Sequence, residues 1–216
     1  DSANAAPTPT PLPRGRHQLS RDEVETSQRL RLALGTATAM AERGYANTPV
    51  ADILEHAGVS RPTFYVFYDN KLDCFLDALD LVGEVLLSQL RSALGATLAP
   101  DRPTDAAMAR AVDAVDVYLD TIIDNLAFAR LYIVEVHAAG PRALTQRAAL
   151  QRRVVDALVD LVGDGSAADR FAGEAFVAAV AALVTLPVTE RDVDGLDALR
   201  EPLRGLLARL FASGVQ

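Results

Sequence analysis

The sequence has no tryptophan, a single cysteine and only three histidines among its 216 residues. Cys74 cannot form an internal disulfide, and its place in a leucine- and phenylalanine-rich helical pattern predicts a packed core thiol. His17, His56 and His137 lack the paired spacing of a metal site. The sequence also contains no HExxH motif, no CxxC motif and no glycine-rich phosphate loop. These absences argue against a metal centre, against a bound cofactor and against an enzyme.

Long hydrophobic runs are missing as well. The longest uncharged apolar stretch, residues 175–188, has 14 residues, whereas a membrane-spanning helix needs about 20. Residues 1–19 are expected to be a disordered tail, because their first part is rich in Ala, Thr and Pro and lacks the apolar core of a signal peptide. The sequence therefore predicts a cytoplasmic protein with no membrane partner.

The net charge of −8 is unevenly distributed along the chain. Residues 14–71 carry eight basic and seven acidic side chains, whereas residues 72–216 carry 13 basic and 21 acidic ones. A weakly basic N-terminal module on an acidic body can still bind DNA, because phosphate contacts are local and are screened beyond about 8 Å at physiological salt. Net charge alone thus does not exclude nucleic acid.

Apolar residues recur at three- and four-residue intervals, and strand-like alternation is absent, which predicts an all-α fold. Residues 20–23 fit a capping box that begins the first helix, and Gly44 ends that helix. Thr48 and Pro49 fit a cap followed by proline at the first position of the second helix. Pro202 should start or kink the last helix. About nine helices are expected, the later ones over 71–94, 104–124, 126–139, 142–162, 167–186 and 195–212.

Three helix boundaries fall within residues 58–70. Gly58 can end one helix with a positive φ, Ser60 can cap the next, and Asn70 can cap a third. Such closely spaced boundaries predict a helix-turn-helix. Residues 61–68 form its short, aromatic-rich second helix, in which Phe64 and Tyr68 share one face and should pack into the core.

The other side chains near this short helix are suited to DNA. Arg61 can bind guanine with two hydrogen bonds, Thr63 can bind a base or a phosphate, and Pro62 can contact a thymine methyl group. Tyr65 can reach a phosphate oxygen. The predicted DNA-binding residues are Arg14, Arg16, Thr48, Ser60, Arg61, Pro62, Thr63, Tyr65, Phe67 and Lys71. The alternative interpretation is an ordinary solvated helix face.

The stretch TPVADILEHAGVSRPTFYVFYDNKLDCFLDAL, residues 48–79, resembles the DNA-binding domain of the TetR family of transcriptional regulators, whose members carry a similar AGVSxxTFYxxFxxKxxL run. The resemblance implies that residues 61–68 are the recognition helix, that Tyr65 and Lys71 hold phosphates, and that Arg61, Pro62 and Thr63 face bases. Members often read His-Tyr-Phe where this chain has Val-Phe-Tyr at 66–68. The hydroxyl expected at Phe67 is therefore missing.

The resemblance further implies a DNA-binding domain over residues 20–70 and a ligand-binding and dimerisation domain over 71–216. It implies a homodimer that binds an operator in double-stranded DNA and responds to a small molecule, most often as a repressor. With no tryptophan and mostly aliphatic stripes, a hydrophobic effector is favoured over a cation. Predicted ligand-binding residues are Tyr118, Thr121, Ile122, Asn125, Phe128, Tyr132, Glu135 and His137. Predicted dimer-interface residues are Phe171, Phe176, Val180, Leu183, Leu203, Leu206, Leu207 and Leu210.

Two other functions stay open from the sequence. One is a helical small-molecule-binding protein that has lost DNA binding. The other is a helical enzyme, for which the sequence offers no catalytic motif.

Overall fold

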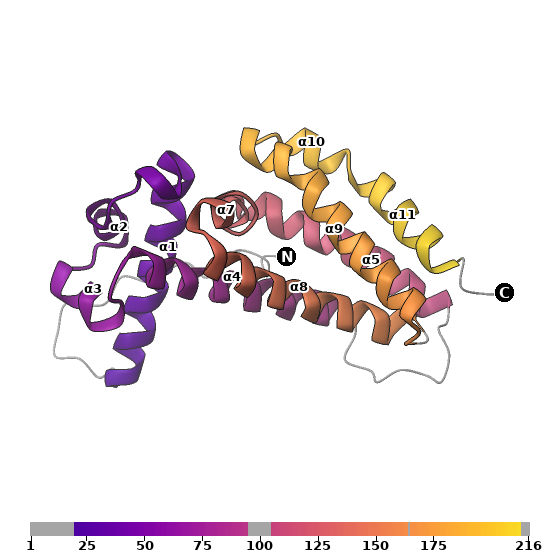
Figure 1. The fold of residues 1–216 in the computed structure, drawn as a ribbon, viewed down its shortest axis with the longest axis horizontal. Helices are drawn as coiled ribbons and strands as arrows, with labels where there is room; N and C mark the ends of the chain where they lie inside the picture. Colours follow the sequence, from indigo (N-terminus) through magenta and orange to yellow (C-terminus); the bar gives the residue numbers. More distant parts are fainter. Residues whose placement is uncertain (1–19, 95–104, 164, 213–216) are drawn as a thin grey trace. The chain divides into compact units, whose positions relative to one another are not determined.

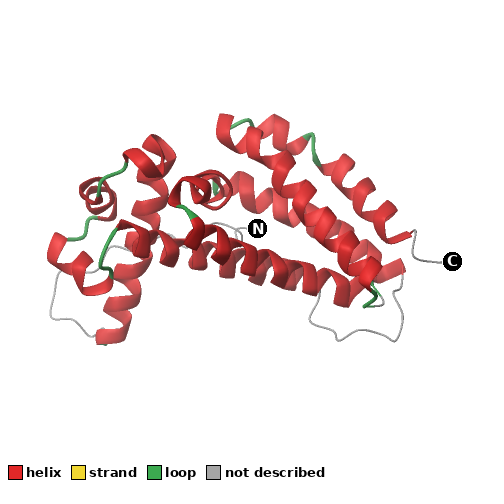
Figure 2. Cartoon of the chain, in the orientation of Figure 1, coloured by secondary structure: helices red, strands yellow, loops and turns green. Residues whose placement is uncertain are grey.

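The computed structural model describes residues 20–94, 105–163 and 165–212, and every regular element in these ranges is a helix (Figures 1 and 2). This confirms the predicted all-α class. In chain order the elements are α1 (Arg21–Asn47), α2 (Val50–Ala57), α3 (Arg61–Phe67), α4 (Lys71–Leu94), α5 (Asp105–Asp124), α6 (Leu126–Arg130), the π-helical turn η1 (Leu131–Glu135), α7 (Val136–Ala139), α8 (Pro141–Val162), α9 (Ala167–Glu190), α10 (Val193–Asp197) and α11 (Arg200–Ala212).

The predicted segments match these elements with a few corrections. Segment 126–139 consists of α6, η1 and α7, and segment 195–212 is divided into α10 and α11. Pro202 lies in the first turn of α11, where its missing N–H would have no intrahelical partner. Pro187 does not end α9, which continues to Glu190 and stops where Arg191 takes a left-handed φ of 58°.

Both ends of α1 follow from local chemistry. The predicted capping box is present, because the Glu23 amide donates to Ser20 Oγ at 3.2 Å and the Ser20 amide donates to Glu23 Oε2 at 2.7 Å. Near its other end α1 is broken at Gly44, whose φ of 76° and ψ of 158° are not helical. Only glycine adopts this conformation readily. The chain then resumes as a short turn to Asn47.

The chain packs as two compact units. Unit 1 comprises the described residues up to Val82 together with Ala127–Leu144, and unit 2 comprises Gly83–Leu126 with the described residues after Leu144. The predicted boundary between the two functional domains at residue 70 stays a prediction, but the compact units are not divided at that residue. Residues of α6, η1 and α7 belong with the N-terminal helices, and α4 contributes to both units.

Unit 1 has a core in which α1, α2, α3 and α4 meet. Its fully buried side chains include Leu32, Met40, Ile53, Phe64, Phe75 and Leu79. Cys74 is also buried, as predicted, with its Sγ 3.2 Å from Thr36 Oγ1. Burial raises the pKa of this thiol to about 12, so it stays protonated and unreactive.

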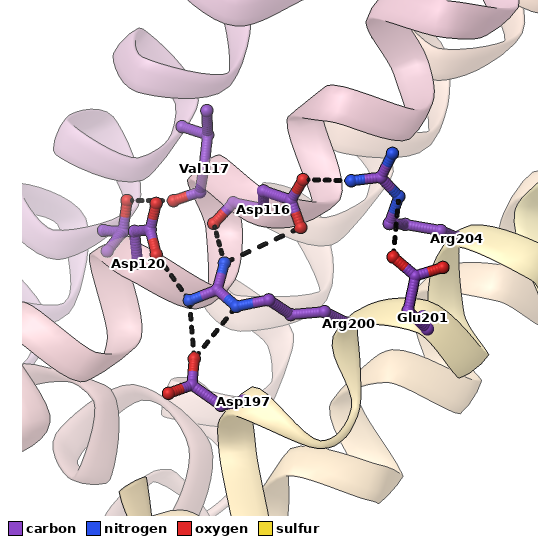
Figure 3. Close-up of polar contacts among 8 residues, drawn as sticks. Asp116, Val117, Asp120, Asp197, Arg200, Glu201 and Arg204 are labelled. Carbon is purple, nitrogen blue, oxygen red and sulfur yellow. Dashed lines mark hydrogen bonds and ion pairs between the residues drawn. The ribbon is translucent and has the colours of Figure 1, made fainter. Parts of the chain in front are cut away.

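In unit 2, Arg200 joins α11 and α10 to α5. Its guanidinium donates from Nη2 to Asp120 Oδ1 at 2.5 Å, from Nε to Asp197 Oδ1 at 2.9 Å, and from Nη1 to the Asp116 carbonyl at 3.3 Å (Figure 3). Arg204, one turn later on α11, donates to Asp116 Oδ2 at 2.5 Å. These contacts fix the last helix against α5.

The apolar helix α9 is incompletely covered within this chain. By length and composition it is the single helix in the described ranges that could cross a membrane, yet only 28% of its most apolar window is buried. Phe171, Leu183 and Leu186 are 72%, 47% and 61% exposed. One side of α9 therefore lacks an apolar neighbour among the described residues.

Candidate nucleic-acid interface

The turn between α2 and α3 is built on Gly58. This residue takes a left-handed φ of 59° and ψ of 38°, and its N–H donates to the Glu55 and Leu54 carbonyls. The next amide, of Val59, also donates to the Leu54 carbonyl, at 3.3 Å. These bonds satisfy the last carbonyls of α2 and turn the chain sharply. The predicted helix boundary at Gly58 is confirmed.

Arg31 of α1 holds this turn from the side. Its Nε donates to the Ala57 carbonyl at 3.0 Å, and its Nη2 donates to the Gly58 carbonyl at 2.5 Å. Two charge-assisted bonds from one planar group fix the orientation of the turn. Sequence reasoning did not single out Arg31, because its position on the polar side of α1 resembles that of any solvated arginine.

Ser60 caps α3, as predicted. Its Oγ accepts from the Thr63 amide at 3.3 Å, and the Ser60 and Thr63 hydroxyl oxygens lie 2.7 Å apart. Thr63 is thus oriented by the cap and is only partly exposed, whereas Ser60, Arg61 and Pro62 are exposed. The first turn of α3 presents its side chains to solvent, which is the arrangement that reading of base edges requires.

Aromatic packing seats α3 on its core. Phe64 is fully buried, and the Phe64 and Tyr68 ring centroids lie 5.4 Å apart. The phenol of Tyr68 donates to Asp77 Oδ2, and burial is the main cause that raises the pKa of Tyr68. Both residues therefore have the core role predicted for them. Tyr65 is 50% exposed and Val66 is 73% exposed on the opposite side of α3.

Phe67 is partly buried beneath an arginine. The guanidinium carbon of Arg29, from α1, lies 5.4 Å from the centroid of the Phe67 ring. A cation at this distance over an aromatic face is attracted by the ring quadrupole. Arg29 was not among the predicted DNA-binding residues, because its neighbour is 38 positions away and periodicity carries no signal of it.

Thr48 does not have its predicted position. The N-cap residue of α2 is Pro49, and no side chain caps this helix. Thr48 is fully buried, with its Oγ1 2.8 Å from the Gly44 carbonyl and 3.3 Å from the Ala39 carbonyl. The hydroxyl closes the broken end of α1 and is not available to a phosphate. Arg14 and Arg16, the other candidates on the N-terminal side, lie outside the described residues.

Lys71 also has a partner within the protein. Its ammonium donates to the Tyr45 carbonyl at 2.6 Å and lies 4.3 Å from the centroid of the Tyr45 ring. Burial lowers the pKa of Lys71. This hydrogen bond uses one of the three N–H donors of the ammonium, and the phosphate contact of Lys71 stays a prediction. In the structure Lys71 ties the start of α4 to the end of α1.

The predicted ligand-binding residues are divided between the two units. Tyr118, Thr121, Ile122 and Asn125 belong to unit 2, whereas Phe128, Tyr132, Glu135 and His137 belong to unit 1. Thr121 Oγ1 lies 2.7 Å from Gln89 Oε1, and the Asn125 side chain donates to the Thr121 carbonyl at 3.1 Å. Ile122 and Tyr132 are buried, and His137 is exposed. A ligand role for these residues stays a prediction.

Glu135 has partners within unit 1. Its carboxylate is 5% exposed and accepts from the Tyr45 amide at 2.7 Å and from Arg130 Nε at 3.0 Å. The π-helical turn η1 places this carboxylate against the break in α1. π-Helical turns inside α-helices occur frequently at functional sites. Glu135 thus connects the α6–α7 segment to the N-terminal helices.

The predicted dimer residues divide by burial. Phe176, Val180, Leu203 and Leu207 are buried within the single chain, and their place in a dimer interface stays a prediction. Leu206 and Leu210 are partly buried. Phe171 and Leu183 remain exposed, on the uncovered side of α9.

The left-handed turn at Gly58 and the exposed face of α3 form a helix-turn-helix motif, the class of motif that many DNA-binding proteins use. Residues 35–78 match the sequence model of the bacterial regulatory proteins of the tetR family. This part of the chain therefore has the sequence of a TetR-family DNA-binding domain. The matched residues include α2, the turn and α3.

Individual relatives agree with this family. The HTH-type transcriptional activator FasR of Mycolicibacterium smegmatis is 28% identical over 125 residues, which are 58% of this chain and 54% of FasR. The match thus spans about half the length of that relative. The fatty acid degradation regulator FadR of Bacillus halodurans has a TM-score of 0.70 at 19% identity, over 82% of this chain and 96% of that chain. FadR of Bacillus subtilis, solved in complex with stearoyl-CoA, has a TM-score of 0.69 at 16% identity, with the same two coverages.

Proposed function

We propose that this regulator is a repressor that binds operator DNA as a homodimer and is released by a hydrophobic small molecule with a long acyl chain. The observation that carries the DNA-binding part is the division of α3 into two sides. Phe64 and Tyr68 lock one side into unit 1, and Arg61 and Tyr65 stand exposed on the other. A rigidly seated helix with an exposed first turn suits insertion into the major groove.

The effector class rests on the relatives. A similar fold binds stearoyl-CoA in the Bacillus subtilis regulator, and a second similar structure belongs to a regulator of fatty acid degradation. The buried side chains of the described helices are largely aliphatic, which suits an acyl chain better than a cation.

A route from effector to DNA is available within unit 1. The α6–α7 segment carries Glu135, and Glu135 binds the Tyr45 amide at the break in α1. A movement of this segment would pull on the same α1 that holds the helix-turn-helix through Arg31. An effector that favours one position of the segment would then change the population of the DNA-binding conformation.

The homodimer part rests on α9. Its exposed residues Phe171, Leu183 and Leu186 would be covered by the same surface of a second copy, as a two-fold interface requires. Leu183→Asp should convert the dimer to a monomer in light-scattering measurements at micromolar concentration. Leu144→Asp, at an exposed leucine of α8, is the matched control and should leave the mass unchanged. A monomeric wild-type protein would contradict this part.

DNA binding is tested by retardation of fragments from the region next to the gene. Arg61→Ala and Tyr65→Ala should each weaken operator binding by about 1–3 kcal/mol. Arg152→Ala, at an exposed arginine of unit 2, removes the same charge elsewhere and should have no effect. Unchanged affinity of both α3 variants would overturn the proposed interface.

The effector class is tested by adding ligands to the preformed complex. Stearoyl-CoA, stearate and CoA alone separate the acyl chain from the headgroup as the recognised part. Release by the acyl compounds, but not by CoA, supports the proposal. DNA binding that is unchanged by both acyl compounds would contradict it.

An activator is the second candidate, because FasR is an activator. Both candidates use the same α3 surface, and they differ in the sign of the response. Deleting the gene should raise transcription of the regulated promoter for a repressor and lower it for an activator.

A further inference from the structure

The cation–π pair between Arg29 and Phe67 lies at the edge of α3. Arg29 belongs to α1 and Phe67 is the last residue of α3, and both lie in unit 1. The ring of Phe67 is partly buried, whereas Arg29 is exposed. An arginine that stacks on a ring keeps its N–H groups at the rim of the guanidinium plane, where they can point to solvent.

The guanidinium of Arg29 has no competing partner among the described residues. None of the hydrogen bonds or ion pairs within these ranges involves it. The carboxylate one turn earlier, Glu25, lies 3.5 Å from Arg21. The Asp77 carboxylate accepts the phenol of Tyr68, the residue after Phe67. These two carboxylates therefore have partners of their own.

Arg31 provides an internal comparison. It lies two residues after Arg29 on the same helix, and two of its N–H groups are used by the carbonyls of Ala57 and Gly58. Arg31 is thus part of the architecture of the turn. Arg29 is held in place by a ring alone, which uses none of its hydrogen-bond donors.

We propose that Arg29 is a DNA-backbone contact, oriented by Phe67 so that its guanidinium binds a phosphate beside the groove that α3 enters. The inference rests on the proposed binding of DNA through α3. A planar guanidinium can give two parallel hydrogen bonds to one phosphate. The stacking on Phe67 fixes the plane before DNA arrives, so less rotamer freedom is lost on binding.

A phosphate contact has a signature that a base contact lacks. Removing it weakens binding to all sequences by a similar factor, and it lowers the slope of log affinity against log salt by about 0.9. Arg29→Ala should therefore weaken binding to operator and to unrelated DNA of equal length by about three- to tenfold each. Arg61→Ala should instead weaken operator binding more than non-specific binding.

The role of Phe67 is tested by a double-mutant cycle. Phe67→Leu keeps an apolar side chain and removes the ring, so Arg29 loses its orientation. We expect Phe67→Leu to weaken DNA binding in the wild type and to have little further effect in Arg29→Ala. Arg29→Lys should retain part of the salt slope and lose the coupling to Phe67, because an ammonium has no plane to orient.

Salt titrations of DNA binding on purified, dimeric full-length protein decide the matter, with Arg152→Ala as the control for charge. Thermal unfolding of each variant separates binding from folding. A salt slope that is unchanged in Arg29→Ala would overturn the proposal, as would a loss of affinity that is matched by a loss of folded protein. If the wild type itself fails to bind any fragment, the proposed DNA-binding function is wrong. If the wild type binds and Arg29→Ala binds equally well, only the proposed role of Arg29 is wrong.

Discussion

The carboxylate of Glu135 accepts a hydrogen bond from the backbone amide of Tyr45, 90 residues earlier in the chain, at 2.7 Å. Gly44 breaks the helical path of α1, so the Tyr45 amide has lost its usual carbonyl partner. Glu135 replaces that partner, and Lys71 binds the Tyr45 carbonyl at 2.6 Å. Both backbone groups of one residue are thus held by side chains from other elements.

We expect Glu135→Ala to lower the free energy of unfolding by about 1–3 kcal/mol, because a buried amide loses its acceptor. The amide proton of Tyr45 should also exchange faster with solvent, as hydrogen-exchange measurements would show. Glu135→Gln is the matched variant. It keeps an oxygen for Tyr45 and removes the charge that faces Arg130, so it should protect the Tyr45 amide better than Ala does. Equal exchange rates in wild type and Glu135→Ala would contradict this role.

The same pair shows what the sequence can and cannot predict. The capping box at Ser20, the left-handed turn at Gly58 and the core positions of Phe64 and Tyr68 depend on residues close in sequence, and they were predicted correctly. Glu135 was assigned to a ligand site because it lies near the junction of two predicted helices, and its contact with the Tyr45 amide, 90 residues away, was not predicted. Thr48 fits the sequence pattern of a helix cap, but in the folded chain its hydroxyl donates a hydrogen bond to the Gly44 carbonyl.

In the candidate DNA site, too, the sequence predicted the roles that depend on neighbouring residues and missed those that depend on distant ones. Arg61 and Tyr65 were accessible to sequence reasoning because they lie within one short helix. Arg29 and Arg31 were not, because their roles come from α1 crossing the end of α3 and the turn. Two arginines two positions apart in the sequence have different contacts, and only the packing of the helices distinguishes them.

Gly35 permits the close approach of α1 and α2. A Cβ atom at this position would lie 2.7 Å from the Ala57 nitrogen and 2.9 Å from the Ile53 carbonyl oxygen. Alanine is the better helix former by about 1 kcal/mol, but these neighbours are backbone atoms that move only if α2 moves. We expect Gly35→Ala to lower the free energy of unfolding by about 1–3 kcal/mol and to weaken DNA binding.

Gly205→Ala is the control for this substitution. A Cβ atom there would meet only the end of the flexible Arg209 side chain, at 3.3 Å. Urea unfolding should therefore show no loss of stability, and a gain of up to about 1 kcal/mol is expected from helix propensity. If Gly35→Ala were as stable as Gly205→Ala, the close packing of α1 on α2 would not require glycine at position 35.

His56 should make the attachment of α2 to α1 depend on pH. Its Nδ1 lies 2.9 Å from the Asp52 carbonyl oxygen, and its Nε2 lies 3.4 Å from Glu42 Oε1. The pKa of His56 is raised mainly by the hydrogen bond to the Asp52 carbonyl. The hydrogen bond and charge of Glu42 and the charge of Glu55 raise this pKa further, whereas burial lowers it. The nearby Asp52 carboxylate is paired with Arg43 at 3.1 Å.

Because the folded state binds this proton more tightly than the unfolded chain does, the stabilising contribution is complete below the ordinary histidine pKa of about 6.5. It is lost as the pH rises through the raised pKa of the folded state. The difference in melting temperature between wild type and His56→Gln should therefore be larger at pH 6 than at pH 8. A difference that does not change with pH would show that His56 contributes no linked proton. An NMR titration of the imidazole measures its pKa directly.

Arg200 should be the most sensitive polar residue of unit 2. Its guanidinium group donates hydrogen bonds to Asp120, Asp197 and the Asp116 carbonyl (Figure 3). The Arg200 side chain is 25% exposed. Hydrogen bonds to charged groups contribute about 1.5–3 kcal/mol when they are shielded from water. We expect Arg200→Ala to lower the free energy of unfolding by about 2 kcal/mol. Arg200→Lys should restore less than half of this loss, because one ammonium cannot reproduce the fork.

Arg170→Ala is the matched control, because the Arg170 and Asp156 side chains form a single pair at 2.9 Å and both are about half exposed. Such surface pairs contribute at most about 1 kcal/mol. Urea unfolding at two protein concentrations separates the fold of the chain from its assembly. If α11 belongs to a dimer interface, the loss in Arg200→Ala should be larger at the higher concentration, because association stabilises the wild type more there and the displaced helix weakens association in the variant. A loss no larger than that of Arg170→Ala would show that the network does not position α11.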